Sequence, residues 1–211
     1  MLAKVLPVSA TVRQVCGDTP EVLGEALQDG VNLAVWQRQL PVHIQTFADA
    51  LLNLAEPLSE SITLHTAAGE REPDLSGLAC GYADIQGYAG FIADVSWLVS
   101  AYACLLGAEQ VGLRLRAMDR AMCPRFHVDH VPMRLITTYA GVGSQWLREA
   151  DVDRTRLGEP QAGAAIQQIH CGEVALLKGE RWTGNEGYGL VHRSPPLERN
   201  QRRLILTLDW L

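Results

Sequence analysis

The sequence has few cysteines, and their spacing excludes the usual disulfide and zinc-knuckle frameworks. Among 211 residues there are five cysteines, an odd number, and no two of them stand as Cys-x-x-Cys. Small secreted domains that rely on disulfide bonds carry an even, closely spaced set. We therefore expect free thiols and a location in the reducing cytoplasm.

Positive charge is also scarce. Lys and Arg number 18 against 24 Asp and Glu, which gives a net charge of −6. The densest basic group is Arg199, Arg202 and Arg203, whereas a nucleic-acid-binding face needs a larger basic patch. The composition therefore predicts no nucleic-acid partner.

Long apolar runs and nucleotide-binding motifs are missing as well. The most apolar segment, 85–106, contains Asp94, Ser96 and Ser100, which favours a buried helix over a membrane span of about 20 residues. The apolar piece at the N-terminus is short and is interrupted by Pro7, which does not fit a signal peptide. The glycine-rich phosphate-loop patterns and the G-x-S-x-G nucleophile motif do not occur. We expect neither a membrane partner nor nucleotide or serine-hydrolase chemistry.

Helical and extended patterns are distributed unevenly along the chain. Helices are predicted within residues 18–30, 41–55 and 85–106, with strands between them. After residue 110, short β-branched segments alternate with Gly and Pro. This pattern predicts a single α+β domain, 1–211. In it a helical and mixed N-terminal layer, 1–110, packs on a double-stranded β-helix (a cupin-like jelly roll) formed by 111–211.

Metal-ligating side chains gather in the segment "CPRFHVDH", residues 123–130. His127 and Asp129 are two residues apart, so on an extended chain they point to the same side, about 6–7 Å apart. An imidazole and a carboxylate so placed can share one metal ion, and His192 at the end of a later apolar run is the candidate third ligand. Two histidines and one carboxylate on one face of an octahedral metal are typical of non-haem Fe(II) oxygenases.

Two arginines open the last apolar segment. Arg203 follows His192 by eleven positions, and its guanidinium fork matches a carboxylate of a 2-oxo diacid. Arg202 and Arg203 point to opposite faces of a strand, so at most one serves a pocket, and the spacing favours Arg203. Tyr139 is a further candidate for contacting a cofactor carboxylate, although a buried tyrosine with one hydrogen-bond partner is the simpler interpretation.

This set of residues resembles the 2-oxoglutarate/Fe(II)-dependent dioxygenase superfamily, and the ending "HRSPP…RRLIL" is similar to its phytanoyl-type branch. The resemblance implies iron at His127, Asp129 and His192, with 2-oxoglutarate bound by Arg203 or Arg202. More closely, "CPRFHVDHVPMRLITTYAGVGSQWL", "GEVALLKGERW" and "VHRSPP" resemble a bacterial family known as domain of unknown function 1826. Its members are often encoded near CobW-type metal chaperones, which implies a context of metal homeostasis.

Other interpretations of the same residues stay open. His127 and Asp129 could be a hydrogen-bonded pair that fixes a strand end without a metal. Cys123, His127, His130 and Cys171 could instead form a tetrahedral zinc site, since thiolates suit zinc. A free cysteine is more often a small buried hydrophobe, and we expect Cys123 to be a buried thiol near the site.

The leading hypothesis is an Fe(II)- and 2-oxoglutarate-dependent oxygenase that acts on a small or peptidyl substrate. The alternative is a non-catalytic protein that binds zinc or another divalent metal through the same residues. A third interpretation is a scaffold that has kept the fold and lost the metal.

Overall fold

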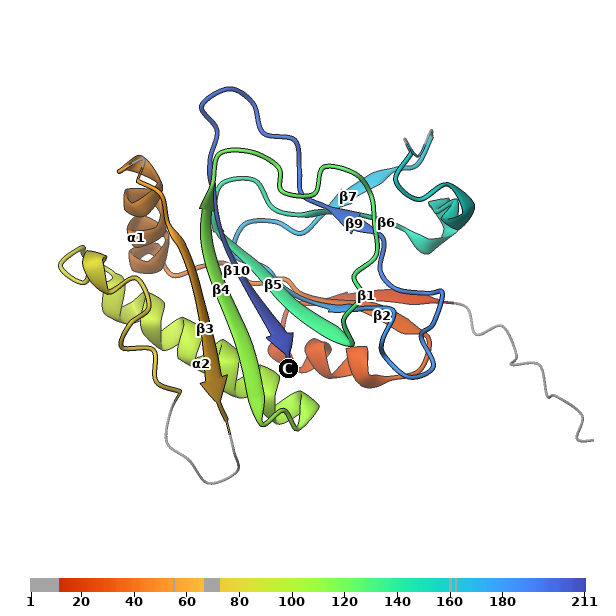
Figure 1. The fold of residues 1–211 in the computed structure, drawn as a ribbon, viewed down its shortest axis with the longest axis horizontal. Coiled ribbons are helices and arrows are strands. Elements are labelled where there is room, and N and C mark those ends of the chain that lie inside the picture. The colour runs from red at the N-terminus through yellow and green to blue at the C-terminus, as the bar shows by residue number, and fades with distance from the viewer. Residues whose placement is uncertain (1–11, 55, 67–72, 160, 162) are drawn as a thin grey trace, which may run out of the picture.

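The computed structural model describes residues 12–54, 56–66, 73–159, 161 and 163–211. A sheet of seven strands runs through the molecule in the order β1-β2-β8-β5-β10-β4-β3 (Figure 1). Only β1 and β2 pair in parallel, and the other neighbours are antiparallel. The strands are β1 (Arg13–Gly17), β2 (Val31–Trp36), β3 (Ser59–His65), β4 (Gln110–Met118), β5 (Met133–Ala140), β8 (Val174–Lys178) and β10 (Arg203–Trp210).

A second, antiparallel sheet has three short strands in the order β7-β6-β9, which are β7 (Ile166–Gln168), β6 (Gln145–Leu147) and β9 (His192–Arg193). Its Trp146 packs with Leu33 and Val35 of β2, so the small sheet covers part of one face of the large sheet. Figure 1 shows β6, β7 and β9 together, above β1 and β2 in that view.

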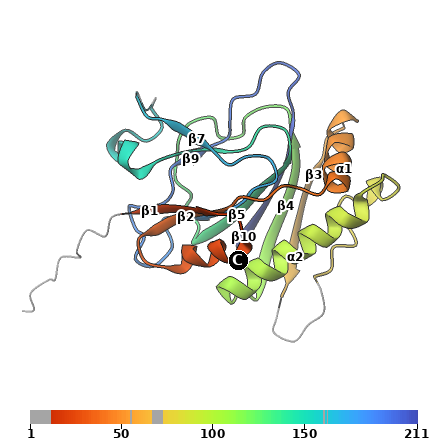
Figure 2. The ribbon, with the colours of Figure 1, turned by 180° about the vertical axis from the view of Figure 1, so that it is seen from behind.

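Two α-helices cover the opposite face of the large sheet, as Figure 2 shows from behind. They are α1 (Val42–Asn53) and α2 (Tyr88–Leu106), and Phe47 and Phe91 from them pack in one buried cluster with the strands. By length and composition α2 could cross a membrane, but its Val95, Leu98 and Val99 are buried in this cluster. The described residues also contain four 3-10 helices: η1 (Pro20–Leu27), η2 (Cys80–Tyr82), η3 (Glu149–Asp151) and η4 (Arg154–Arg156).

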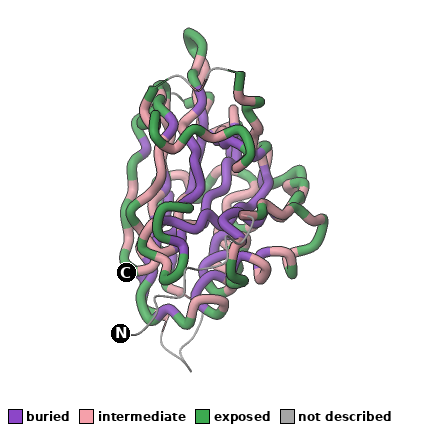
Figure 3. Tube along the Cα trace, turned by 90° about the vertical axis from the view of Figure 1, so that its right-hand side faces the viewer, coloured by how far each residue is buried: buried purple, intermediate pink, exposed green. Residues whose placement is uncertain are grey.

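The alternation of side chains along the central strands separates the two faces. On β10, Leu204, Leu206 and Leu208 belong to the cluster under the helices, and Arg203 and Ile205 point to the other face. The same parity holds on β4, whose Val111, Leu113 and Leu115 face the helices. Figure 3 shows the central strands as the most buried part of the trace. Residues on the far side of β4, β5 and β10 therefore face the space beside the small sheet.

The chain is a mixed α+β protein with two sheets, as the sequence predicts at the coarse level. The predicted division at residue 110 does not separate the layers. Strands β1, β2 and β3 from the first 110 residues lie in the same sheet as β4, β5, β8 and β10. Pairings such as β2 with β8 join segments that are far apart in the sequence, and local patterns carry no information about them.

Candidate metal centre

Three side chains from two separate segments converge on one point beside the small sheet. His127 and His192 face each other across an isolated antiparallel bridge, in which each backbone N–H donates to the other's carbonyl at 3.0 Å. Their rings lie side by side, with centroids 4.6 Å apart. One ligand atom from each histidine and one from Asp129 all lie within 4.8 Å of one another. The backbone bridge therefore sets the position of both rings.

Both imidazoles turn the same ring nitrogen toward the carboxylate. Nδ1 of His127 lies 3.0 Å from the carbonyl of Arg125, and Nδ1 of His192 lies 3.1 Å from the carbonyl of Leu190. A proton on each Nδ1 satisfies these carbonyls and leaves the Nε2 lone pair free. Nε2 of His127 is 3.7 Å from Asp129 Oδ1, and Nε2 of His192 is 3.4 Å from Asp129 Oδ2. Ligands bound to one metal at 2.0–2.2 Å and right angles stand about 3 Å apart, close to these distances.

Asp129 is held in place by an arginine. Arg134 Nη1 donates to Asp129 Oδ2 at 2.7 Å, and Arg134 also binds Asp209 through Nε at 2.7 Å. Arg114 completes the chain with a contact of 2.6 Å to Asp209. Arg134 thus orients the carboxylate so that Oδ1 faces His127 and Oδ2 faces His192.

The electrostatic surroundings favour an ionised carboxylate. Burial opposes ionisation of Asp129, but its contact with His127, its attraction to His192 when that ring is protonated at low pH, and the charge of Arg134 outweigh burial and hold its pKa at about 2. The contact with Asp129 raises the pKa of His127, whereas burial lowers the pKa of His192. The triad thus combines a carboxylate and a neutral, buried imidazole, which are the forms that bind metals.

A glycine allows the loop that carries Asp129 to pack against the end of β8. A Cβ on Gly179 would lie 2.1 Å from the carbonyl oxygen of Val131 and 2.7 Å from that of Asp129. The neighbouring Glu180 donates its backbone N–H to the Asp129 carbonyl at 2.9 Å. Any side chain at position 179 would push this loop away, so the glycine fixes the place of the carboxylate.

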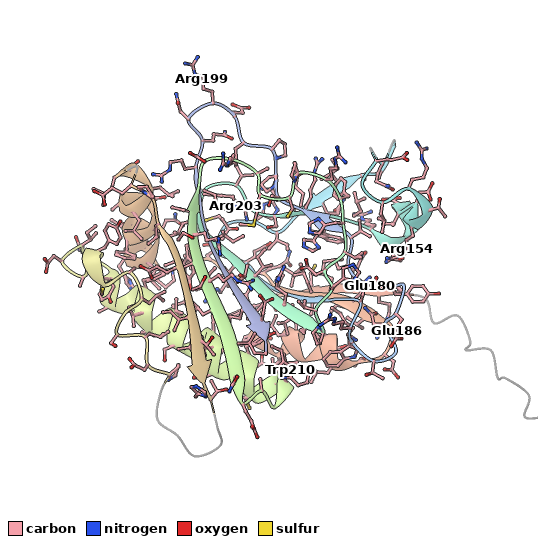
Figure 4. All side chains as sticks on the ribbon, in the orientation of Figure 1. Arg154, Glu180, Glu186, Arg199, Arg203 and Trp210 are labelled. Atoms are coloured by element: carbon pink, nitrogen blue, oxygen red, sulfur yellow. The ribbon has the colours of Figure 1, made fainter. Side chains whose placement is uncertain are left out.

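Arg203 lies buried on the same face of the sheet as the triad, with 1% of its surface exposed (Figure 4). Its Nη2 donates to Thr138 Oγ1 at 3.1 Å and to Ser144 Oγ at 3.0 Å. Within the described part of the chain, its Nε and Nη1 have no hydrogen-bond partner. Burial lowers its pKa from 12.5 to about 10. The protein thus buries a guanidinium beside neutral hydroxyls, a costly arrangement without an anion.

Arg202 points the other way. It donates from Nη1 to the carbonyl of Leu52 at 2.7 Å and from Nη2 to the carbonyl of Glu56 at 2.9 Å, at the end of α1. A turn brings Ser144 to Arg203: Gly141 has a φ of +82°, and a Cβ there would lie 2.2 Å from the carbonyl oxygen of Arg202. Of the two candidate arginines, Arg203 is therefore the one that contacts a residue of the cavity wall shared with His127 and His192, namely Ser144.

Tyr139 does not reach this site, which corrects the role suggested by its sequence position. Its side chain is fully buried in the cluster under the helices, where its hydroxyl donates to Asp94 Oδ2 at 2.6 Å. It points to the opposite face of β5 from Arg134 and Thr138. Tyr139 and Arg38 instead share Asp94, which ties α2 to the sheet.

The cysteine-containing zinc site does not assemble. Cys123 is exposed rather than buried as expected, and the Cys171 thiol lies against Gln45, with 3.8 Å between Sγ and Oε1. His130 is exposed. In the ranges that the structure describes, the triad is the only cluster of at least three His, Cys, Asp or Glu side chains arranged to hold a metal ion.

A cavity of about 250 Å³ opens beside the triad. His127 and His192 line it, and so does Ser144, which contacts Arg203. Its remaining lining residues are Arg114, Arg116, Met118, Met122, Cys123, Arg134, Ile136, Arg193, Ser194, Ile205 and Thr207.

The arginines of this wall were not identified as site residues from the sequence. The alternating pattern of β4 does place Arg114 and Arg116 opposite its apolar side chains, which was the available signal. Nothing in the sequence joins Arg134 to Asp129, because the contact depends on the path of the loop between them.

The chain belongs to the family described as "Protein of unknown function (DUF1826)", which matches residues 17–209 and confirms the resemblance seen in the sequence. No curated protein shows a significant similarity to it.

Several solved structures of oxygenases are similar to this chain at low identity. A prolyl-4-hydroxylase from Pseudomonas putida is 13% identical, with 90% of this chain and 96% of that chain covered and a TM-score of 0.48. The dioxygenase for auxin oxidation 1 from Arabidopsis thaliana, in complex with 2-oxoglutarate, is 9% identical, with coverages of 95% and 92% and a TM-score of 0.48. An oxidoreductase of the 2OG-Fe(II) oxygenase family from Burkholderia pseudomallei is 10% identical, with coverages of 95% and 96% and a TM-score of 0.46. At these identities and TM-scores, the similarity by itself assigns no activity to this chain.

Proposed function

We propose that this member of the DUF1826 family is a non-haem Fe(II)- and 2-oxoglutarate-dependent oxygenase that acts on a small or peptidyl substrate. The observation that carries the proposal is the convergence of His127, Asp129 and His192, with both Nε2 atoms turned toward the carboxylate. Two imidazoles and one carboxylate oxygen are the donor set of this class of iron site. In this interpretation the two facing sheets form a double-stranded β-helix with the site at one end.

The residues around the triad fit this donor set. Arg134 holds Asp129 by one oxygen, and the carbonyls of Arg125 and Leu190 fix the tautomers of the two rings. Such supporting contacts orient metal ligands and tune their basicity. Iron bound here would supply oxygen activation coupled to decarboxylation of the 2-oxo acid, while the protein provides orientation and charge.

Arg203 supports 2-oxoglutarate as the second ligand. A guanidinium has five N–H donors, and two of them, on Nη2, are taken by Thr138 and Ser144. The donors on Nε and Nη1 have no partner among the residues described. A carboxylate that reached Arg203 past Ser144, which lines the cavity, would supply partners for these donors and neutralise the buried charge.

Titration of the Fe(II)-loaded protein with 2-oxoglutarate under anaerobic conditions tests the proposal. The wild type should bind, and Arg203→Ala should bind about 30-fold to several thousand-fold more weakly. Truncating one partner of a buried charge pair costs about 2–5 kcal/mol, and each 1.4 kcal/mol is about tenfold. Arg202→Ala is the matched control and should keep the wild-type affinity, because Arg202 contacts the backbone at the end of α1.

The alternative, a non-catalytic divalent-metal protein, uses the same triad and predicts a different result. In that case the purified protein binds zinc or another divalent metal stoichiometrically but does not bind 2-oxoglutarate and forms no succinate from it. If the wild-type protein bound no divalent metal, both functions would be contradicted.

A further inference from the structure

The cavity beside the triad is rich in arginine, although the whole chain is acidic. Arg114, Arg116, Arg134 and Arg193 line it, and Arg203 lies behind Ser144 at its wall. Among the residues that the structure describes, the carboxylates that contact these arginines are Asp129 and Asp209. Five positive and two negative charges leave +3 in this region, in a chain whose net charge is −6.

The arginines differ in how far their charge is already compensated. Arg134 binds both aspartates, and Arg114 binds Asp209. Arg193 contacts no carboxylate among the residues that the structure describes: its Nε donates to Gln145 Oε1 at 2.8 Å, and its guanidinium lies 4.4 Å from the centre of the Phe126 ring.

Arg116 is the arginine with the least compensation. It has no ion pair or side-chain hydrogen bond with any residue that the structure describes. Of the four arginines that line the cavity, Arg116 and Arg193 are therefore the two without a carboxylate partner in the described part of the chain.

The cofactors of the proposed function do not remove this excess. A divalent metal ion adds two positive charges, and 2-oxoglutarate adds two negative charges, so the sum of +3 is unchanged. Like charges that line a concave wall of low dielectric constant raise the local concentration of anions. The remaining charge is thus available for a further anionic molecule.

A second hollow adjoins the cavity. This hollow of about 260 Å³ shares Arg116, Met118 and Met122 with the first and adds Arg120 and Asp119. Arg116 stands at the junction of the two hollows. The two methionines offer adaptable apolar contacts next to it.

We infer that the substrate of this site is an oxyanion, a carboxylate or a phosphate ester, whose charged group is bound by Arg116 and Arg193 while its apolar part contacts Met118 and Met122. The chemistry performed on that molecule rests on the proposed oxygenase function, but its binding through the arginines does not depend on the metal. Arg116 is thus a specificity-determining residue.

Calorimetric titration with small probes tests the inference. The zinc-loaded protein, saturated with 2-oxoglutarate, is titrated with phenyl phosphate, benzoate and the uncharged benzyl alcohol. At least one of the two anions should bind and benzyl alcohol should not, and the stronger anion identifies the headgroup. Arg116→Gln should weaken anion binding by about tenfold or more, the size expected for one charge-assisted contact. Arg116→Lys keeps the charge and should lose less.

Arg199→Gln is the matched control, because Arg199 is exposed on the loop that projects from the molecule (Figure 4) and lines neither hollow. It makes the same change in charge and should leave binding within about twofold of wild type, since Arg199 contacts neither hollow and solvent and salt screen an exposed charge. An equal loss in Arg116→Gln and Arg199→Gln would overturn the inference. So would equal binding of benzyl alcohol, or no binding of either anion.

Two further results separate this inference from the proposed function. If anions bind only when 2-oxoglutarate is absent and compete with it, the arginines serve the cofactor and the inference is wrong, while the oxygenase proposal stands. If neither metal nor 2-oxoglutarate binds but Arg116→Gln still loses anion binding in the metal-free protein, the oxyanion site stands and the oxygenase proposal fails.

Discussion

Arg134 Nη1 lies 2.7 Å from Asp129 Oδ2, and this ion pair fixes the single carboxylate of the triad. The side chains of Arg134 and Asp129 are 20% and 14% exposed, so solvent screens the pair only partly. Since Arg134 also binds Asp209, the carboxylate is tied to the last strand of the sheet as well as to its own loop.

Replacing Arg134 should therefore weaken metal binding without abolishing it. Arg134→Met removes the contact that orients Asp129, and changes in such supporting residues cost about 10- to 100-fold in metal affinity. Competition between the protein and a chelating dye for zinc measures the effect. Arg114→Met is the control, because Arg114 contacts Asp209 and not Asp129. Equal affinities in the two variants would show that the ion pair does not support the metal site.

The same carboxylate should link the stability of the metal-free protein to pH. Its pKa of about 2 lies below the ordinary value of 3.8. A carboxyl whose pKa is lower in the folded state stabilises the fold above its unfolded pKa, and this contribution is lost as the pH falls through the folded pKa. The difference corresponds to about 2 kcal/mol.

Asp129→Asn should therefore lower the free energy of unfolding by about 2 kcal/mol near neutral pH, and its difference from wild type should shrink between about pH 4 and pH 2. Urea unfolding at several pH values measures this, with the exposed Asp84→Asn as control. If the difference in unfolding free energy between Asp129→Asn and wild type did not change with pH, it would contradict the lowered pKa of Asp129.

The triad and the phase of the last strand could be predicted from the sequence, because both depend on short-range geometry. His127 and Asp129 share a side through the spacing of an extended chain, and Arg203 and Arg202 take opposite sides of β10 for the same reason. His192 could be proposed as the third ligand only from its residue type and from its position later in the chain. The structure adds the backbone bridge that joins them.

The supporting contacts could not be predicted in the same way. Side chains alternate between two faces only along an extended chain, and the loop 130–132 interrupts this alternation. The face of β5 on which Tyr139 lies therefore could not be derived by counting residues from Asp129. Likewise, β1, β2 and β3 join the large sheet through long-range pairing, and a local pattern says whether a strand forms but not which strand it pairs with.

Cys123 should prove dispensable for metal binding. Its thiol is exposed at the cavity, and it is not part of the cluster formed by His127, Asp129 and His192. Cys123→Ser should leave the metal stoichiometry of the purified protein unchanged, whereas His192→Ala should abolish it. Elemental analysis of both variants after metal loading measures this. Loss of stoichiometric zinc in Cys123→Ser would favour a mixed nitrogen and sulfur site.

Under the proposed function, Arg203 should show the opposite behaviour from most buried residues, because its charge would serve a ligand at a cost to the stability of the fold. The lowering of its pKa from 12.5 to about 10 by burial corresponds to about 3 kcal/mol against the charged side chain. Arg203→Met keeps much of the volume and removes the unpaired charge, so the metal-free variant should be at least as stable as wild type. Arg203→Met should also no longer be stabilised by 2-oxoglutarate, whereas metal-loaded wild type should gain about 2.7 kcal/mol at a ligand concentration 100 times its Kd.

Arg202→Met is the control. It loses two hydrogen bonds to the backbone, so it should be less stable than wild type and still respond to 2-oxoglutarate. Urea unfolding with and without the ligand measures both effects; a destabilised Arg203→Met that still responds to 2-oxoglutarate would show that Arg203 is a structural residue.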